Sequence, residues 1–360
     1  MTAETIEIDK FPATRYQGSK RRLLPWFHET LKSYKFKSAL DLFGGTGIVS
    51  YLFKKMGKRV FYNDILKFNY WIGVALIENS EIKLSDRDIE FLLNKQKGID
   101  YPRLIQVNFR DIYYKDDENR FLDMIVKNIQ MFDKRYDNEI AFYKKSMAYY
   151  SLFQSCIIKR PFNLFHRKNL NIRLSNVHRT FGNKTTWERS FEHYFIKFVL
   201  EINKSVFDNG EKNIASNFDA LNYRENDFDL VYIDPPYTSE KIPTRICNYY
   251  KNYHFLEGIV NYDKWLNSIN FNFNNLPLNN DGYNWTSKDG NIKGFEKIIE
   301  NFQDSIIVLS YKDPGSPSIK ELIEIIQQYK KSKVNIYKTP HFYALNKNNG
   351  HYSEILIVAK

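Results

Sequence analysis

A strand, a glycine-rich turn, a helix and a second strand follow one another in this chain within about 30 residues, the length of one βαβ unit. The run SALDLFGGTG contains the first strand and the turn, IVSYLFKKMG contains a helix that ends at Gly57, and RVFYND contains the second strand. A βαβ unit joins two parallel strands through a helix. The order therefore predicts an α/β protein built on a parallel sheet.

Short apolar runs typical of further buried strands follow in the second half of the chain. They are NIASNF, DLVYID, SIIVLSY, KVNIYK and SEILIVA, with the helical run IKELIEIIQQY between the third and the fourth. Residues 80–185 lack a strand period and favour long helices over 120–133 and 139–158. We therefore expect one sheet domain, residues 1–80 and 190–360, interrupted by a mainly helical insert, residues 81–189.

The excess of basic residues indicates the kind of partner. Lys and Arg number 53 against 42 Asp and Glu, which gives a net charge of +11. This surplus suits a polyanion, because neutralised phosphates release counterions; a basic solvated surface would explain it equally well. Cys156 and Cys247 lie far apart, so neither a metal site nor a disulfide framework is expected. No apolar segment has the length of a membrane span, and we expect a cytoplasmic protein without membrane contact.

The turn Asp41-Leu-Phe-Gly-Gly-Thr-Gly47 is a candidate ligand-binding loop. Its glycines let the backbone approach a ligand closely, and the helix that follows offers free N–H groups. The spacing differs from the dinucleotide fingerprint, and a tight loop without ligand remains an alternative. Asp64 ends the second strand, where a carboxylate can accept hydrogen bonds from ribose hydroxyls; a turn or a helix cap is the competing explanation.

The sharpest signal is the sequence Asp234-Pro235-Pro236-Tyr237. The preceding apolar run is a strand, and the paired prolines end it at the edge of the sheet. Prolines fix the backbone, so that a carboxylate, a carbonyl and an aromatic face point into one small space. A proline-stiffened loop with a packed tyrosine is the structural alternative.

These four residues fit the methylation of an exocyclic amine, whose lone pair is delocalised into the base ring. If the Asp234 carboxylate and the Pro235 carbonyl each accept one N–H, the nitrogen is drawn toward tetrahedral geometry and its lone pair can attack a methyl group. Each charge-assisted bond contributes about 1.5–3 kcal/mol. Tyr237 can stack on the base and replace the stacking that the base loses when it leaves the duplex. No covalent nucleophile is required.

In this order, RYQGSK, DLFGGTG, Asn63-Asp64 and DPPY resemble the motifs of the D12 class (Dam-like, alpha class) of S-adenosylmethionine-dependent DNA adenine-N6 methyltransferases. The runs RPFNLFHRKN, YKNYHFLEG and LSYKDPG resemble further segments of the family. The resemblance implies a Rossmann-like class I methyltransferase with a mostly parallel seven-stranded sheet and an inserted target-recognition domain. It also implies the reaction, which is methyl transfer from S-adenosylmethionine to N6 of a flipped-out adenine in double-stranded DNA.

The resemblance assigns roles to individual positions. In the catalytic motif they are Asp234, Pro235, Pro236 and Tyr237. For the cofactor they are Tyr16, Lys20, Asp41, Phe43, Gly45, Gly47, Asp64, Asn217, Phe218 and Asp234, where Lys20 answers the cofactor carboxylate and Asn217-Phe218 replaces the usual Asp-Phe pair. The segment 160–173 resembles the DNA-recognition strand and hairpin, with Arg160, Arg167, Lys168, Asn169 and Arg173 as its DNA contacts. A solvated basic face is the alternative for that segment.

Other activities stay open at this level. Cytosine-N4 methylation uses the same amine chemistry, although relatives with that activity more often carry Ser in place of Asp234. Amine methylation of RNA and a non-catalytic DNA-binding module on the same fold are two further alternatives. Cytosine-C5 methylation is disfavoured, because neither cysteine follows a proline. The family context implies a separate cognate restriction endonuclease and a chain that acts as a monomer at the nucleoid of a prokaryote.

Overall fold

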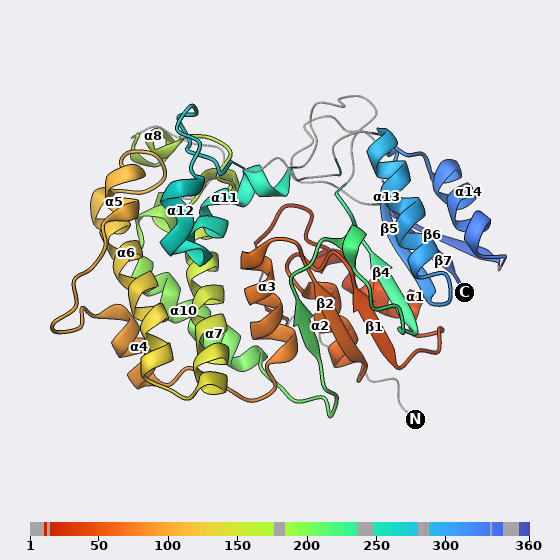
Figure 1. The fold of residues 1–360 in the computed structure, drawn as a ribbon, viewed down its shortest axis with the longest axis horizontal. Coiled ribbons are helices and arrows are strands. Elements are labelled where there is room, and N and C mark those ends of the chain that lie inside the picture. Colours follow the sequence, from red (N-terminus) through yellow and green to blue (C-terminus); the bar gives the residue numbers. More distant parts are fainter. Residues whose placement is uncertain are drawn as a thin grey trace.

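The computed structural model describes residues 11–12, 15–175, 184–236, 248–279, 285, 288–331, 333–340 and 353–360. Figure 1 shows two neighbouring parts, a twisted sheet with its covering helices and a bundle of helices beside it.

Among the described residues, seven strands form one sheet in the order β3-β2-β1-β4-β5-β7-β6. Neighbouring strands are parallel, except that β7 runs antiparallel to both β5 and β6. The strands are β1 (Ser38–Asp41), β2 (Arg59–Asn63), β3 (Ile214–Ser216), β4 (Leu230–Ile233), β5 (Ile306–Asp313), β6 (Val334–Pro340) and β7 (Ser353–Ala359). The predicted α/β class with a mostly parallel seven-stranded sheet is confirmed.

Helices cover both faces of the sheet, as expected for buried parallel strands. Alternate residues of β4 show the division, because Leu230 and Tyr232 belong to one apolar cluster and Val231 and Ile233 to another. The first cluster includes residues of α1 (Leu24–Leu31), α2 (Ile48–Lys55) and α3 (Lys67–Gly73), which continues as a π-helix over Val74–Glu78. The second includes residues of α13 (Lys288–Asn301) and α14 (Ile319–Tyr329).

The helical part packs around α7 (Asn138–Ile158), a helix of 21 residues. Thirteen of these are buried, including every residue from 146 to 157, and Ser151 and Ser155 donate their buried hydroxyls to carbonyls one turn earlier. The other helices there are α4 (Asp86–Leu93), α5 (Leu104–Asn108), α6 (Asp116–Gln130), α8 (Leu170–Leu174), α9 (Lys184–Glu188), α10 (Phe191–Ser205), α11 (Tyr249–Val260) and α12 (Tyr262–Ser268). The helices expected over 120–133 and 139–158 are thus present.

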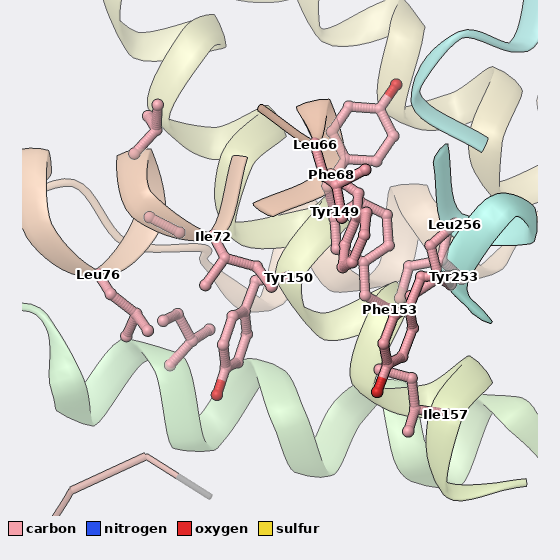
Figure 2. Packing of buried hydrophobic residues seen from close by; sticks show 14 of the residues in the cluster. Leu66, Phe68, Ile72, Leu76, Tyr149, Tyr150, Phe153, Ile157, Tyr253 and Leu256 are labelled. Atoms are coloured by element: carbon pink, nitrogen blue, oxygen red, sulfur yellow. The ribbon is translucent and has the colours of Figure 1, made fainter. Parts of the chain in front are cut away.

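The helical part and the sheet share one apolar core. Figure 2 shows Ile72 of α3 next to Tyr150 of α7, and Phe68 of α3 on the side of Phe153 of α7 and Tyr253 of α11. Phe68 contacts both neighbours directly, with ring centroids 5.7 Å from Phe153 and 5.6 Å from Tyr253. Although α11 follows β4 in the chain, it packs in the helical part (Figure 1). The domain division at residues 80 and 190 stays a prediction.

The segment 160–173 differs from its expected form. It contains a 3₁₀ turn (Pro161–Asn163) and the start of α8, whereas the resemblance implied a strand and hairpin. Pro161 favours this turn because proline suits the first position of a helix. None of the described helices is both long and apolar enough to span a bilayer.

Candidate active site

A pocket opens at the carboxyl ends of β1, β2 and β4. In the sheet order, β1 stands between β2 and β4: the chain runs from β1 outward through β2 to β3 and then returns to the other side of β1 as β4. Such a switch point is where ligands bind in open α/β sheets. Counted with its open mouth, the pocket holds about 890 Å³ of empty space, a usual size for a small-molecule site. Its walls come from distant segments: residues 16–20, 41–46, 48–49, 63–66 and 218–220, with Tyr232, Asp234, Pro236, Tyr249 and Trp285.

The pocket brings together most of the residues predicted to hold the cofactor. Tyr16, Lys20, Asp41, Phe43, Gly45, Asp64, Phe218 and Asp234 all line it. Gly47 does not line it but begins α2 as its N-cap, with a φ of +68°. The roles of these residues toward a ligand stay predictions.

The glycine turn is pressed against Tyr62 of β2. A Cβ atom on Gly44 would lie 2.0 Å from the Tyr62 ring, so only glycine fits at this position. Gly45 has a φ of +52°, which L side chains rarely adopt, and its carbonyl accepts a hydrogen bond of 2.8 Å from the Tyr62 hydroxyl. The backbone of the turn is therefore fixed, with its free surface toward the pocket.

Asp64 is fixed by several hydrogen bonds at the end of β2. Its Oδ2 accepts 2.8 Å from Gly45 N and 3.1 Å from Asn69 Nδ2, while its Oδ1 accepts 2.8 Å from Leu66 N. Burial nevertheless raises the pKa of this carboxyl to about 6. Since each carboxylate oxygen has two acceptor sites, Oδ1 keeps capacity for a hydroxyl donor.

Asp41 ends β1 and is almost fully buried. Its Oδ2 accepts a hydrogen bond of 2.6 Å from the Ser50 hydroxyl, whereas Oδ1 has no partner among the described residues. Burial raises the pKa of Asp41 to about 7, and the charges of Asp234 and Asp64 add to the rise. An unpartnered buried carboxylate oxygen on a pocket wall is suited to a cationic or N–H ligand group.

Asp234 follows β4 directly and shares a buried ammonium with a second carboxylate. Lys20 Nζ lies 3.2 Å from Asp234 Oδ1 and 2.8 Å from Glu354 Oε1. Burial raises the pKa of Asp234 to about 6, and Lys20 opposes that rise while Glu354 adds to it. The structure thus places Lys20 beside the predicted catalytic carboxylate. Pro236 lines the pocket, Pro235 is buried, and Tyr237 lies outside the described residues.

The segment that carries Tyr16 is held in place by α11. The ring of Tyr16 stacks on Tyr253 and Tyr249, with centroid distances of 4.6 Å and 5.2 Å. Gln17 N also donates 2.8 Å to the Tyr253 hydroxyl, and Asn252 donates 3.1 Å to the Gln17 side chain. Helix α11 therefore shapes one wall of the pocket.

The predicted adenine contact of Asn217 does not match its placement. Its amide donates to the backbone carbonyls of Asp64 and Ile65, at 2.7 Å and 2.9 Å, and it is absent from the pocket wall. Phe218 and Asp219 line the pocket instead. Asn217 thus turns away from the pocket, while Asp219 lines it and also accepts a hydrogen bond of 3.0 Å from Leu221 N.

A comparison with protein-family models identifies the family of this chain. The family model described as D12 class N6 adenine-specific DNA methyltransferase matches residues 16–303. The chain belongs to this family. It is therefore a site-specific DNA methyltransferase that acts on N6 of adenine, and the resemblance read from its motifs is confirmed.

Curated relatives agree with the family. The chain is 27% identical to the type II methyltransferase M2.HphI of Haemophilus parahaemolyticus, over 98% of both proteins. It is 28% identical to the modification methylase StsI of Streptococcus sanguinis, over 95% of this chain but 50% of that relative. It is 24% identical to the type II methyltransferase M.NlaIII of Neisseria lactamica, over 88% of both proteins.

Three of the predicted DNA contacts of this D12 methyltransferase are buried. Arg160 donates to the carbonyls of Leu164, Tyr113 and Arg167 and to the side chain of Asn169, and its guanidinium lies 4.3 Å from the Tyr113 ring centroid. Arg173 donates 2.8 Å and 3.0 Å to the two oxygens of Glu118. The prediction that Arg160, Asn169 and Arg173 contact DNA is therefore at odds with the structure, which uses them to fold the segment.

Arg167 and Lys168, by contrast, are exposed, and they remain candidates for DNA contact. The segment 160–173 is thus basic for two different reasons. Its buried cations bind carbonyls and Glu118, while its exposed cations face solvent. No grouping of three or more metal-binding side chains occurs in the part of the chain that the structure describes.

The sequence analysis did not identify Glu354 or Trp285, nor the position of Asp219 on the pocket wall. Glu354 carried a visible signal, because it is a carboxylate near the start of the otherwise apolar run SEILIVA. Trp285 lines the pocket and packs against Phe43, with ring centroids 5.4 Å apart, but no motif surrounds it.

Proposed function

We propose that this D12 methyltransferase transfers the methyl group of S-adenosylmethionine to N6 of an adenine that is flipped out of double-stranded DNA. The observation that carries the proposal is the position of Asp234. Asp234 directly follows β4 and lines the same pocket as the glycine turn and Asp64. The acceptor for the amine and the binding surface for a nucleoside cofactor thus meet in one pocket.

The donor set of the pocket fits this cofactor. S-adenosylmethionine supplies a methyl group on a sulfonium, and it also carries an ammonium and a ribose. Asp41 would hold the ammonium with its unpartnered Oδ1, and Asp64 would accept from the ribose hydroxyls. Phe43 and Phe218 offer apolar surface for the adenine ring, and Asp219 would take the place that the family gives to the acidic residue of Asp-Phe.

Asp234 is arranged to accept an N–H from the substrate amine. Its Oδ1 faces Lys20, while no interaction of Oδ2 is found within the described part of the chain. We assign Oδ2 and the Pro235 carbonyl as the two acceptors that localise the nitrogen lone pair. Each bond is worth about 1.5–3 kcal/mol, so that two of them supply several powers of ten in rate. Tyr237 retains its predicted role as the stacking partner of the base.

The exposed pair Arg167 and Lys168 would contact phosphates or base edges. The names of the relatives support a role as the modification enzyme of a restriction-modification system, in which a separate endonuclease cuts the unmodified site. We also propose that the enzyme acts as a monomer in the cytoplasm, since one base is modified at a time.

One experiment tests the activity directly. The purified protein is incubated with duplex DNA and S-adenosylmethionine, and the DNA is digested to nucleosides for mass spectrometry. N6-methyladenine is the expected product. N4-methylcytosine would support the cytosine alternative, and a lack of any methylated base in DNA that the protein binds would indicate a non-catalytic module.

A further inference from the structure

A carboxylate from the last strand lies beneath the predicted catalytic aspartate. Glu354 is fully buried, and its Oε1 accepts 2.8 Å from Lys20 Nζ and 2.6 Å from the Ser310 hydroxyl. Because β7 runs antiparallel to β5, its first residues lie at the edge where β1, β4 and β5 end. Glu354 therefore lies at the same edge of the sheet as Asp234, although it comes from a distant part of the chain.

We propose that Glu354 is a positioning residue for methyl transfer, which acts by holding the Lys20 ammonium between two carboxylates. The inference rests on the proposed function, because it concerns the same Asp234. Lys20 then shares its charge between Glu354 and Asp234, and Asp234 keeps Oδ2 for the adenine amine. If Lys20 were paired with Asp234 alone, it would neutralise more of the charge on that carboxylate and weaken the hydrogen bond from the amine.

The surrounding charges support this arrangement. The ionisable groups close to Asp234 are Lys20, Glu354, Asp41 and the buried Tyr232 hydroxyl. Lys20 lowers the pKa of Asp234 and Glu354 raises it, so the two residues act on the aspartate in opposite directions. A buried carboxylate is costly unless it is paired. The ion pair with Lys20, and not the packing of β7, thus explains why a carboxylate is buried at position 354.

The test compares three variants by the pH dependence of methylation. Glu354→Gln removes the charge and keeps the shape, and we expect the acid limb of the kcat profile to move to lower pH while the plateau falls about tenfold. Lys20→Met should move the acid limb in the opposite direction. The matched control is Asp123→Asn, which removes another buried carboxylate, one that accepts 2.8 Å from Ile105 N and 2.9 Å from Gln106 N in the helical part.

The control should lose stability without moving the acid limb. If Glu354→Gln folds poorly, Glu354→Asp keeps the charge but draws it back from Lys20, and a smaller shift in the same direction is expected. An acid limb that stays in place or moves upward in the Glu354 variants overturns the inference. These outcomes are read on an enzyme that makes N6-methyladenine, so wild-type protein without that product contradicts the proposed function instead.

A second, independent observation concerns an ordered loop with exposed aromatic side chains. After α12, residues Ile269 and Leu278 form an antiparallel bridge, and Asn270 N donates 2.7 Å to Pro277 O. The tip of this loop presents Phe271 and Phe273, which are 60% and 56% exposed. The loop rises beside α8 in Figure 1. Two exposed rings on one hydrogen-bonded loop offer apolar surface to a partner.

We infer that Phe271 and Phe273 contact the bases of duplex DNA. The loop is fixed to the basic segment, because Asn275 donates 3.3 Å to Phe165 O and Tyr113 donates 2.7 Å to Asn275 O. Phe165 lies two residues before the exposed Arg167, and neither 160–173 nor 269–279 contains an acidic residue. Apolar side chains of this kind insert between base steps or stack on unpaired bases.

The double variant Phe271→Ala/Phe273→Ala tests this contact. The probe is a duplex oligonucleotide that carries the site methylated by the wild-type enzyme. We expect binding to weaken about tenfold or more, with an unchanged slope of log Kd against log salt, because rings release no counterions. Leu200→Ala, at an exposed position of α10, is the control and should bind like wild type. Wild-type affinity in the double variant, or a changed salt slope, overturns the inference.

Discussion

Two buried charge clusters in this protein have opposite composition. At the pocket, one ammonium, that of Lys20, lies between Asp234 and Glu354, with Asp41 and Asp64 close by. In the helical part, one carboxylate, that of Glu118, is paired with both Lys159 and Arg173, and Arg160 lies nearby. The first cluster has an excess of acid and the second an excess of base.

The clusters also differ in how the excess is balanced. Arg160, Arg173 and Lys159 donate to backbone carbonyls, so the protein itself satisfies most of the basic cluster, although Arg173 Nε has no partner among the described residues. The acidic cluster faces a pocket and leaves Asp41 Oδ1 without a partner among the described residues. A charge excess whose groups are hydrogen-bonded within the protein stabilises the fold. A charge excess on the wall of a cavity is available to bind a ligand. Because both clusters are buried, burial alone does not distinguish a structural ion pair from one at a binding site, whereas the presence of a neighbouring cavity does.

Glu118→Ala should break the structural cluster and gives the largest expected effect. Removing one partner of a buried ion pair costs about 3–5 kcal/mol, because the remaining charges stay buried and unpaired. Urea denaturation measures the change in the free energy of unfolding. A decrease smaller than about 1 kcal/mol would show that carbonyls alone balance the three cations.

Asp234→Ala removes a carboxylate from the cluster at the pocket, and we expect it to impair the methylation reaction. The rate of methylation should fall by about 10²–10³, the usual cost of removing one preorganised electrostatic interaction. Affinity for S-adenosylmethionine, measured by calorimetry, should change far less. A decrease in cofactor affinity as large as the decrease in rate would mean that Asp234 holds the cofactor instead of the amine.

Asp41→Asn tests the acidic cluster through the pH dependence of the free energy of unfolding. Burial raises the pKa of Asp41 from 3.8 to about 7, so the folded protein binds a proton that the unfolded chain has released, and folding is penalised increasingly as pH rises through this range. The variant, measured without cofactor, should therefore be stabilised more near neutral pH than in mild acid. Urea titrations of both proteins at the two pH values give the difference. Equal effects at both would contradict a raised pKa.

The opposite sign is expected at Glu118, whose pKa is lowered, chiefly by its bond to Arg173, against the effect of burial. Its contribution to stability is present above its ordinary pKa and is lost as pH falls below it. Glu118→Gln should accordingly cost more at neutral pH than in acid, which is a useful control for the Asp41 experiment.

Arg167→Ala/Lys168→Ala gives the smallest effect. Both side chains are exposed, and the variant should fold like wild type. Its affinity for duplex DNA should fall several-fold, and the salt slope should decrease by about two, because each of the two cations would neutralise one phosphate. An unchanged slope would place the DNA surface elsewhere.

The sheet could be predicted because each strand carries its own local signal. The runs ending at Asp41, Asp64 and Asp234 are apolar and stop at glycine, a polar pair or proline, and parallel strands bring such ends to one edge. The placement of these three carboxylates in one pocket follows from that rule and needs no side-chain detail.

The basic segment could not be predicted in the same way. Arg160 and Arg167 have similar neighbours in the sequence, but one is buried against Tyr113 and the other is exposed. The difference depends on the carbonyl and the ring of Tyr113, which come from a distant part of the chain. Glu354 was missed for a related reason, since the antiparallel return of β7 decides which edge of the sheet it reaches.

The wide separation of Lys20 and Glu354 in the sequence has a consequence for folding. Lys20 lies near the beginning of the chain and Glu354 near its end, 334 positions apart, and they meet only after β7 has docked beside β5. Before β7 docks, Lys20 can pair with Asp234 but not with Glu354. The full set of charges around Lys20 therefore forms only when the last described strand has joined the sheet.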